Sequence, residues 1–214
     1  NSKTTNKRTR EIEICIDILK NARNELYLSM RFFDVILSGF EFLPDTKISG
    51  MGTDGFTVYF YPDYLIGLYQ KTPVQVNRAY LHYDFSLSFR AFEQPDHAEE
   101  QYWNLACDIV VESIIDELNE HSVRKYVPPY RKGVYQKLRE KMEVLTPKGV
   151  YWELLGMHLE EEQFGKMQEE FFVDDHVLWN ENVSPEKCIE REKKWKEQNE
   201  KLQTEMETFS KEAS

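Results

Sequence analysis

Residues 72–92 read TPVQVNRAYLHYDFSLSFRAF and contain the clearest helix signals of the chain. Thr72 offers an N-cap, Pro73 stands at the first helical position, and Gln75 supplies the partner of a capping box. Apolar side chains then recur at helical spacing, at Val74, Leu81, Phe85, Phe89 and Phe92. Arg78 stands within this stripe, where a hydrophobic residue is due. The stretch predicts a helix that packs an apolar face on a core and carries one arginine in that face.

The residues before this helix predict a leading helix and a small sheet. Between residues 11 and 31 apolar side chains recur at helical spacing, at Ile12, Cys15, Ile16, Leu19, Ala22 and Leu26. Residues 56–61, FTVYFY, are aromatic and β-branched and predict a strand that ends at Pro62. The TDG triplet at 53–55 is typical of a tight turn. The strand either belongs to a hairpin of the core sheet or offers an edge to an extended peptide.

A second long helix is predicted to be buried on almost every side. Residues 102–118 read YWNLACDIVVESIIDEL, and between Leu105 and Ile115 the polar exceptions are Asp108, Glu112 and Ser113. A helix that is apolar on nearly all of its faces is typically buried in the protein core. Asp108 and Glu112 stand four residues apart on one face. Since buried carboxylates are costly unless they are paired, we expect a cationic partner for them.

The remaining segments set the predicted domain boundaries. Short helices are predicted at about 131–142 and 147–158, and the second begins at a Thr-Pro N-cap signal. We expect a flexible arm at residues 1–10, one domain at 11–180 and a helical connector at 181–214. The connector has one narrow apolar seam, formed by Trp195, Leu202, Met206 and Phe209. It either packs back on the domain, pairs with another chain or leads into a further domain.

The composition is that of an acidic protein with a substantial core. Of the 214 residues, 41% are hydrophobic and 14% are aromatic, which is enough for a folded domain. The net charge of −11 argues against nucleic-acid binding, because phosphate backbones require a basic face. No apolar run reaches the length of about 18 residues that a membrane span needs, and no signal peptide opens the chain. Three cysteines, far apart, predict neither a zinc knuckle nor a disulfide framework, so a cytoplasmic location is expected.

The order of these motifs resembles a known domain. Four segments carry the resemblance: TDGFTVYFYPDYL (53–65), RAYLHYDFSLSFR (78–90), WNLACD (103–108) and VDDHVLW (173–179). They resemble the zincin-like metallopeptidase domain that precedes a von Willebrand factor A-like domain in many bacterial proteins. The resemblance covers about residues 11–180 and implies an α+β, mainly helical fold with a small sheet packed on the motif helix. The motif residues it implies are Thr53, Asp54, Gly55, Trp103, Asn104, Asp174, Asp175, His176 and Trp179.

The resemblance also implies which residues stand at the peptidase positions. The motif helix of such a domain carries H-E-x-x-H, in which two imidazoles bind zinc and the Glu takes a proton from zinc-bound water. Here Arg78 falls on the first His, Ala79 on the catalytic Glu and His82 on the second His. Asp108 falls on a further ligand position. His82 and Asp108 therefore match the pattern, and Arg78 and Ala79 depart from it.

The two departures favour a site without zinc. Ala79 cannot accept a proton, and a catalytic zinc takes three protein ligands and a water. Arg78 brings a fixed positive charge to the place of a dication. Unit charges ~4 Å apart repel by ~4 kcal/mol at an effective dielectric constant of ~20, and a dication meets roughly twice that repulsion. We therefore expect no metal and no other cofactor.

We expect Arg78 to take the place of the metal. A guanidinium bridges carboxylates with a planar fork, so our hypothesis is a buried Arg78–Asp108 ion pair, with Glu112 in the same pocket. His82 is expected to be hydrogen-bonded alongside. In one alternative Arg78 extends to solvent and Asp108 bonds an unrelated backbone group. In another, an unusual metal site survives.

The leading functional hypothesis is a catalytically inactive metallopeptidase-like module that serves as an interaction or scaffold domain. The resemblance implies a von Willebrand A-like domain of the same parent chain as its partner, and also an AAA-type ATPase, although no residue here indicates the latter. The alternative is a metal-dependent peptidase whose zinc site is rearranged around His82 and Asp108. Its third ligand would be Asp84, Glu112 or His176. No nucleic-acid or membrane partner is expected.

Overall fold

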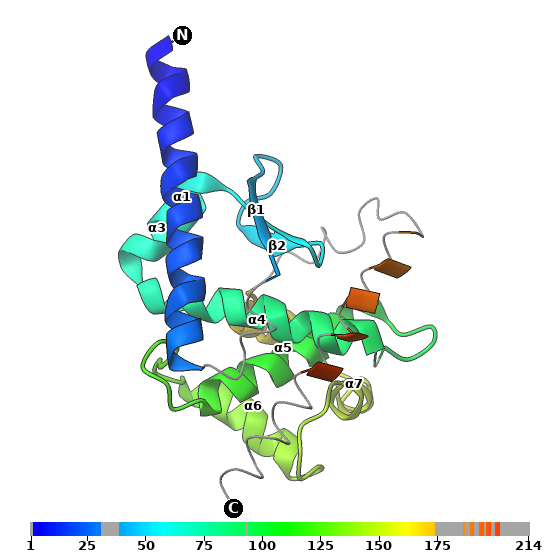
Figure 1. Cartoon of the computed structure of the whole chain (residues 1–214). Helices are drawn as coiled ribbons and strands as arrows, with labels where there is room; N and C mark the ends of the chain where they lie inside the picture. The colour runs from blue at the N-terminus through cyan, green and yellow to red at the C-terminus, as the bar shows by residue number, and fades with distance from the viewer. Residues whose placement is uncertain are drawn as a thin grey trace, which may run out of the picture. The chain divides into compact units, whose positions relative to one another are not determined.

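A computed structural model describes residues 2–30, 39–92 and 94–173, together with scattered positions between 186 and 201. Across these residues the protein is mainly helical, with seven defined helices and one three-stranded sheet (Figure 1). The predicted α+β, mainly helical fold class is therefore confirmed. No helix among the described residues combines the length and the apolar character that a bilayer span requires.

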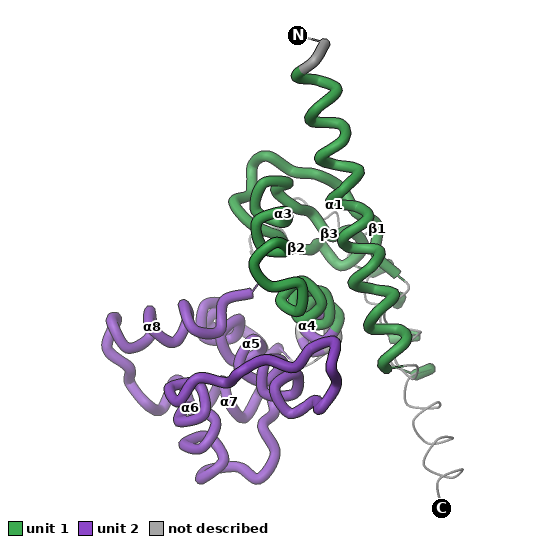
Figure 2. Tube along the Cα trace, turned by 90° about the vertical axis from the view of Figure 1, so that its left-hand side faces the viewer, with its two compact units in different colours: residues 1–84, 174–214 green, residues 85–173 purple. Residues whose placement is uncertain are grey.

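The chain divides into two compact units (Figure 2). Residues 1–84 and 174–214 form the first unit, and residues 85–173 form the second. These limits differ from the predicted boundaries after residues 10 and 180. Local composition cannot show that the end of a chain groups with its beginning, because that grouping depends on contacts between residues distant in sequence.

The first unit opens with helix α1 (Ser2–Ser29), the long blue helix of Figure 1. Residues 2–10 belong to this helix, so the prediction of a flexible arm is wrong for them. They contain no Gly or Pro, and Arg8 pairs with Glu11 at 3.3 Å and with Asp63 at 3.1 Å. An apolar stripe marks only the buried part of a helix, which is why the polar extension was missed.

The sheet of the first unit contains three short strands. They are β1 (Glu41–Pro44), β2 (Met51–Thr53) and β3 (Thr57–Phe60). The order is β1-β3-β2, with β1 parallel to β3 and β2 antiparallel to β3. The strand predicted at 56–61 is therefore confirmed. It forms a hairpin with β2 through the TDG turn and stands in the middle of the sheet.

Two helices follow the sheet. α3 (Pro62–Lys71) begins with a proline in its first turn and packs against α1, which also contacts β1. α4 (Pro73–Phe92) begins at the predicted proline and continues into the second unit. The core of the first unit includes Cys15, Leu19, Leu26, Val58, Phe60, Leu65, Val76 and Leu81.

The second unit is helical throughout its described elements. After the end of α4 it contains α5 (Glu100–Glu117), α6 (Pro129–Arg139), α7 (Pro147–Gly156) and α8 (Glu161–Phe171). α5 packs against α7 and α8. The predicted burial of α5 is confirmed, because Leu105 to Ser113 are all buried, and so is Ile115. α5 is thus the central helix of this unit.

The short helices of the second unit were predicted in part. Those expected at about 131–142 and 147–158 correspond to α6 and α7. The N-cap of α7 is confirmed, since Thr146 Oγ1 accepts a hydrogen bond from the backbone N–H of Gly149 at 3.1 Å. α8 was not predicted, because only three of its residues are buried. They are Phe164, Met167 and Phe171.

The predicted connector at 181–214 is described only at scattered positions between 186 and 201, all of them helical. The seam residues lie outside the described residues. They are Trp195, Leu202, Met206 and Phe209.

Candidate functional site

The candidate site is built on α4, which buries several polar side chains. Their exposed fractions are 4% for Asn77, 1% for Arg78, 0% for His82, 0% for Asp84 and 1% for Ser86. Burying a polar group costs free energy unless it finds a partner. α4 is therefore the element in which specific pairing or a ligand is expected.

The peptidase positions implied by the resemblance all lie inside the protein. Arg78 and His82 are four residues apart and share one face of α4. Arg78 is buried, which excludes the alternative in which its side chain extends to solvent. Ala79 is 3% exposed, so its methyl group is packed where the resemblance places the catalytic Glu. This part of the helix contains a buried cation and no proton acceptor at position 79.

Another face of α4 points toward the other elements of the first unit. It carries Asn77, Tyr80 and Asp84, which are spaced three and four residues apart. Asn77 Nδ2 donates a hydrogen bond to Glu25 Oε2 of α1 at 2.7 Å. The ring of Tyr80 meets the ring of Phe42 in β1 edge-on, with 6.1 Å between centroids. Strand β1 of the sheet therefore contacts α4 through this ring pair.

Asp84 is a buried carboxyl group whose two oxygens have no hydrogen-bond partner among the described residues. Burial raises the pKa of Asp84 well above its usual value, and the nearby charge of Lys194 opposes part of that rise. Asp84 and His82 are two positions apart, so they point to different sides of α4. This geometry argues against Asp84 as the third ligand in a metal site that contains His82.

The charge beside Asp84 comes from the last segment of the chain. Lys194 Nζ donates a hydrogen bond to the backbone oxygen of Gly39 at 3.1 Å and lies 5.0 Å from the ring centroid of Phe56. Burial lowers the pKa of Lys194, and the charges of Asp84 and Asp54 act against this lowering. Sequence reasoning missed Lys194, because it stands in a run of charged residues that resembles any solvated helix.

The two carboxylates singled out on α5 are buried, as predicted. Glu112 has a cationic partner within its own unit, since Arg131 Nη1 of α6 donates to Glu112 Oε2 at 2.8 Å. The expectation of a cation is therefore confirmed for Glu112, and the residue that provides it was not foreseen. A signal was present, because Arg131 stands three and four residues before Val134 and Tyr135, on the apolar face of α6.

Arg131 is the centre of a cluster of charges in the second unit, which we call the Arg131 cluster. Besides Glu112, Arg131 Nη1 contacts Asp116 Oδ2 at 3.3 Å. Arg131 Nε donates to Glu170 Oε1 at 2.9 Å, and Nη2 donates to the backbone oxygen of Glu170 at 2.7 Å. The guanidinium carbon lies 4.9 Å from the ring centroid of Phe171. The cluster ties α5, α6 and α8 together through one planar cation.

The ionisation of the Arg131 cluster is fixed by its contacts. Burial acts to lower the pKa of Arg131, but the charges of Glu112 and Asp116 outweigh it, and the pKa is raised. Tyr135 donates its hydroxyl hydrogen to Asp116 Oδ2 at 2.7 Å. Burial and the charge of Asp116 raise the pKa of Tyr135. Because Arg131 stays charged and Tyr135 stays neutral near pH 7, the cluster is suited to holding helices together rather than to transferring protons.

The predicted pair of Arg78 with Asp108 joins residues that belong to different units. It stays a prediction, as does the placement of His82 beside that pair.

The TDG motif forms a tight turn that its own side chains hold in place. Asp54 Oδ1 accepts hydrogen bonds from the backbone N–H groups of Phe56 and Thr57, both at 2.9 Å. Thr53 Oγ1 accepts one from the backbone N–H of Gly55 at 3.0 Å. Gly55 has φ 97°, a left-handed value that favours glycine. These contacts account for the motif as the connection of the β2–β3 hairpin.

The WN motif contributes to the core of the second unit. Trp103 of α5 is buried and meets Tyr151 of α7 edge-on, with 5.9 Å between ring centroids. Asn104 beside it is partly buried. Four further motif residues lie outside the described residues. They are Asp174, Asp175, His176 and Trp179.

Within the described part of the chain, no three His, Cys, Asp or Glu side chains are grouped so that they could hold a metal ion. His97, His121 and His158 are exposed.

In comparisons with known proteins, no family model, curated protein or solved structure matches the chain. The resemblance to a zincin-like domain therefore stays a prediction that rests on the motifs.

Proposed function

We propose that the chain is a catalytically inactive, metallopeptidase-like module that serves as an interaction or scaffold domain. The observation that carries the proposal is the buried Ala79, at the position where the resemblance places the catalytic Glu. A methyl group cannot take a proton from a metal-bound water. Arg78, buried beside it, adds a fixed positive charge at the position of the first His ligand.

The partners belong to the same proposal and rest on the resemblance. They are a von Willebrand A-like domain of the parent chain and an AAA-type ATPase, in a cytoplasmic setting. A module that lacks a catalytic base contributes to such an assembly through its surfaces, which is the reason for proposing a scaffold role.

A zinc titration of the full chain tests the absence of a catalytic metal site. A ligand that binds only the folded state stabilises it by about 2.7 kcal/mol at about 100 times its Kd. We expect no zinc-dependent rise in Tm, and no stoichiometric metal by elemental analysis of the purified protein. A rise in Tm that the His82→Asn variant loses would contradict the proposal.

Rebuilding the motif tests the resemblance itself. The double substitution Arg78→His with Ala79→Glu restores two imidazoles four residues apart on α4, with a carboxylate between them. We expect this variant to gain a zinc-dependent rise in Tm, and a matched Arg78→Gln with Ala79→Gln control to gain none. If the rebuilt variant folds and its Tm does not rise with zinc, the resemblance of α4 to a peptidase helix is wrong. The proposal that the unmodified chain is catalytically inactive would not be affected.

The second candidate is a metal-dependent peptidase with a site rearranged around His82 and Asp108. The observation in its favour is that both side chains are buried polar groups, with exposed fractions of 0% and 5%. In that case the two residues would hold a zinc that activates water. Stoichiometric zinc in the unmodified chain, lost in both His82→Asn and Asp108→Asn, would favour this candidate over the first.

A further inference from the structure

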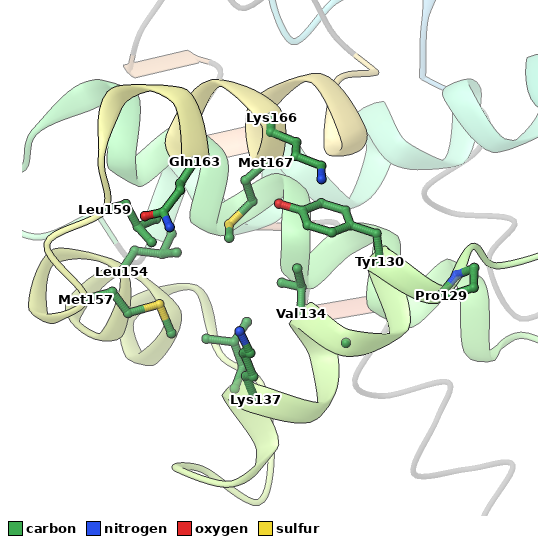
Figure 3. Close-up of a pocket in the computed structure, with 12 residues that line it drawn as sticks. Pro129, Tyr130, Val134, Lys137, Leu154, Met157, Leu159, Gln163, Lys166 and Met167 are labelled. Carbon is green, nitrogen blue, oxygen red and sulfur yellow. The ribbon is translucent and has the colours of Figure 1, made fainter.

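The second unit contains a cavity of about 380 Å³ between α6, α7 and α8, shown in Figure 3. Its size falls within the range of about 300–1,000 Å³ that is usual for ligand sites. Most of its lining is apolar, and includes Tyr130, Val134, Leu138, Leu154, Met157 and Met167. The polar side chains of its lining are Lys137, Gln163 and Lys166. We call this cavity the α6–α8 groove.

The charge of the groove is opposite to that of the chain. The sequence contains 38 acidic and 27 basic residues, yet the residues that line the groove include two lysines and no Asp or Glu. Lys137 comes from α6 and Lys166 from α8, and Figure 3 shows their side chains on opposite sides of the cavity. Lys166 Nζ lies 4.6 Å from the ring centroid of Tyr130. The groove therefore favours a ligand that carries negative charge at two separate points around an apolar centre.

The secondary structure around the groove limits how a partner can bind. The described elements of the second unit are all helices, so they provide no strand edge to which an extended peptide could add. Recognition must then act through side chains. Met157 and Met167 are flexible and polarisable, and such side chains adapt to the apolar residues of a partner. An amphipathic helix in a groove is the recognition mode that fits these constraints.

We infer that the α6–α8 groove binds an acidic amphipathic helix of a partner protein. Apolar residues on one face of the partner helix fill the groove, and carboxylates on its two flanks pair with Lys137 and Lys166. The acidic helix gives a partner class to the proposed interaction role, and it rests on that proposed function. It uses no residue of α4.

A pair of designed peptides tests the chemistry of the ligand. The probe is a fluorescein-labelled amphipathic helix of about 14 residues, with Leu and Phe on one face and Glu on both flanks. The matched peptide keeps the apolar residues and has Lys in place of each Glu. By fluorescence anisotropy with the full chain, we expect the acidic peptide to bind about tenfold more tightly. Added salt should reduce the difference. Equal binding of the two peptides would overturn the assigned charge of the ligand.

Charge reversal at the groove tests the two lysines. Lys137→Glu and Lys166→Glu each alter an exposed side chain, so both variants should fold. We expect each to weaken binding of the acidic peptide by about fivefold. Lys132→Glu is the matched control, because Lys132 is exposed on α6 and does not line the groove. It should change binding by less than about twofold. Equal loss in all three variants would indicate a general charge effect and would contradict the site.

Filling the groove tests its location. Gly133 lines the groove, and a Cβ at this position would meet no atom within 4 Å, so Gly133→Phe places a ring in open space. The variant should keep its fold, because Gly is a poor residue for a helix interior. We expect it to bind the acidic peptide at least about tenfold more weakly. Gly165→Phe on α8 is the control: its Cβ would also meet no atom within 4 Å, and Gly165 does not line the groove.

Two further results would contradict the inferred binding of an acidic helix in the α6–α8 groove. If decanoate binds in a manner blocked by Gly133→Phe while neither peptide binds, the groove is a small-molecule site and the inference is wrong. Peptide binding that Gly133→Phe leaves unchanged would place the partner elsewhere. Either result would leave the zinc titration unaffected, so a failure here is distinct from a failure of the proposed inactivity.

Discussion

Both units bury charged side chains, but they differ in what surrounds them. In the second unit Arg131 contacts three carboxylates, those of Glu112, Asp116 and Glu170. In the first unit Asp84 is fully buried, and neither of its oxygens has a hydrogen-bond partner among the described residues. The partner of a buried group, more than its depth, therefore decides whether that group is ionised. Arg131 keeps its charge, whereas Asp84 is driven toward its neutral form.

The same difference separates a structural role from a responsive one. The Arg131 cluster resists change, because removing its guanidinium would take the shared cation away from three carboxylates. A carboxyl with a raised pKa and one nearby lysine is expected to respond to pH and to a change in the segment that carries the lysine. Asp84 and Lys194 are therefore the pair at which the first unit is expected to be sensitive to its surroundings.

The largest effect is expected in the second unit. Arg131→Leu removes the guanidinium that contacts the buried side chains of Glu112 and Asp116, and breaking a buried pair in this way costs about 3–5 kcal/mol of the free energy of unfolding. Urea unfolding followed by circular dichroism measures the loss. Lys132→Leu, at the exposed neighbour, should stay within about 0.5 kcal/mol of the unmodified chain. A similar cost for both variants would show that the Arg131 cluster is not the stabilising element.

Asp84→Asn should act in the opposite direction and stabilise the first unit near pH 7. In the unmodified chain, folding requires Asp84 either to keep its charge in a buried position or to take up a proton, and both cost free energy. The Asn variant avoids this cost, which is on the order of 2 kcal/mol. The measurement is urea unfolding of both proteins from pH 4 to pH 8, with the exposed Asp96→Asn variant as control. A loss of stability in Asp84→Asn at pH 7 would contradict the unfavourable burial that we assign to Asp84.

The sign of the pH dependence follows from the raised pKa of Asp84. Below the unfolded pKa of about 3.8, both states hold the proton and the contribution of Asp84 does not change with pH. Above it the unfolded chain releases the proton while the folded state keeps it, so stability falls until the folded pKa is passed. The stability of Asp84→Asn relative to the unmodified chain should therefore grow as the pH rises from about 4 toward neutrality.

Tyr135→Phe tests how far the Arg131 cluster depends on its neutral member. The substitution removes the 2.7 Å hydrogen bond to Asp116. Hydrogen bonds to charged groups contribute about 1.5–3 kcal/mol, and we expect a cost of about 1.5 kcal/mol here. The cost should be smaller than that of Arg131→Leu, because Asp116 keeps its contact with Arg131. Tyr130→Phe on the same helix is the control and should cost less than about 0.5 kcal/mol. Equal costs for the two tyrosines would contradict the assigned role of the Tyr135 hydroxyl.

The smallest effect is expected at Lys194. Lys194→Met removes the hydrogen bond to Gly39 and the contact with Phe56, at a cost of about 1 kcal/mol. This is well below the cost at Arg131, since Asp84 can respond to the lost cation by keeping its proton. Removing the positive charge should also raise the pKa of Asp84 further, so the fall of stability with pH should extend to higher pH. An unchanged pH profile would show that Lys194 does not act on Asp84.

Features that short-range contacts control could be predicted from the sequence. The start of α4 at Pro73, the N-cap at Thr146 and the turn at Asp54 were predictable, because each depends on side chains within a few residues of one another. The burial of Arg78 was also visible, since its place in an apolar stripe is a matter of helical period. The same signal is present at Arg131, which lies on the buried face of α6 with Val134 and Leu138.

Which side chains contact one another over long distances in sequence depends on the tertiary fold. Glu112 pairs with a cation 19 residues away, and Lys194 reaches a backbone oxygen 155 residues before it. Hydrophobic periodicity tells which face of a helix is buried, but it does not tell which element covers that face. Pairing depends on how elements distant in sequence pack, and that packing also set the pKa of Asp84, the division into two units and the α6–α8 groove.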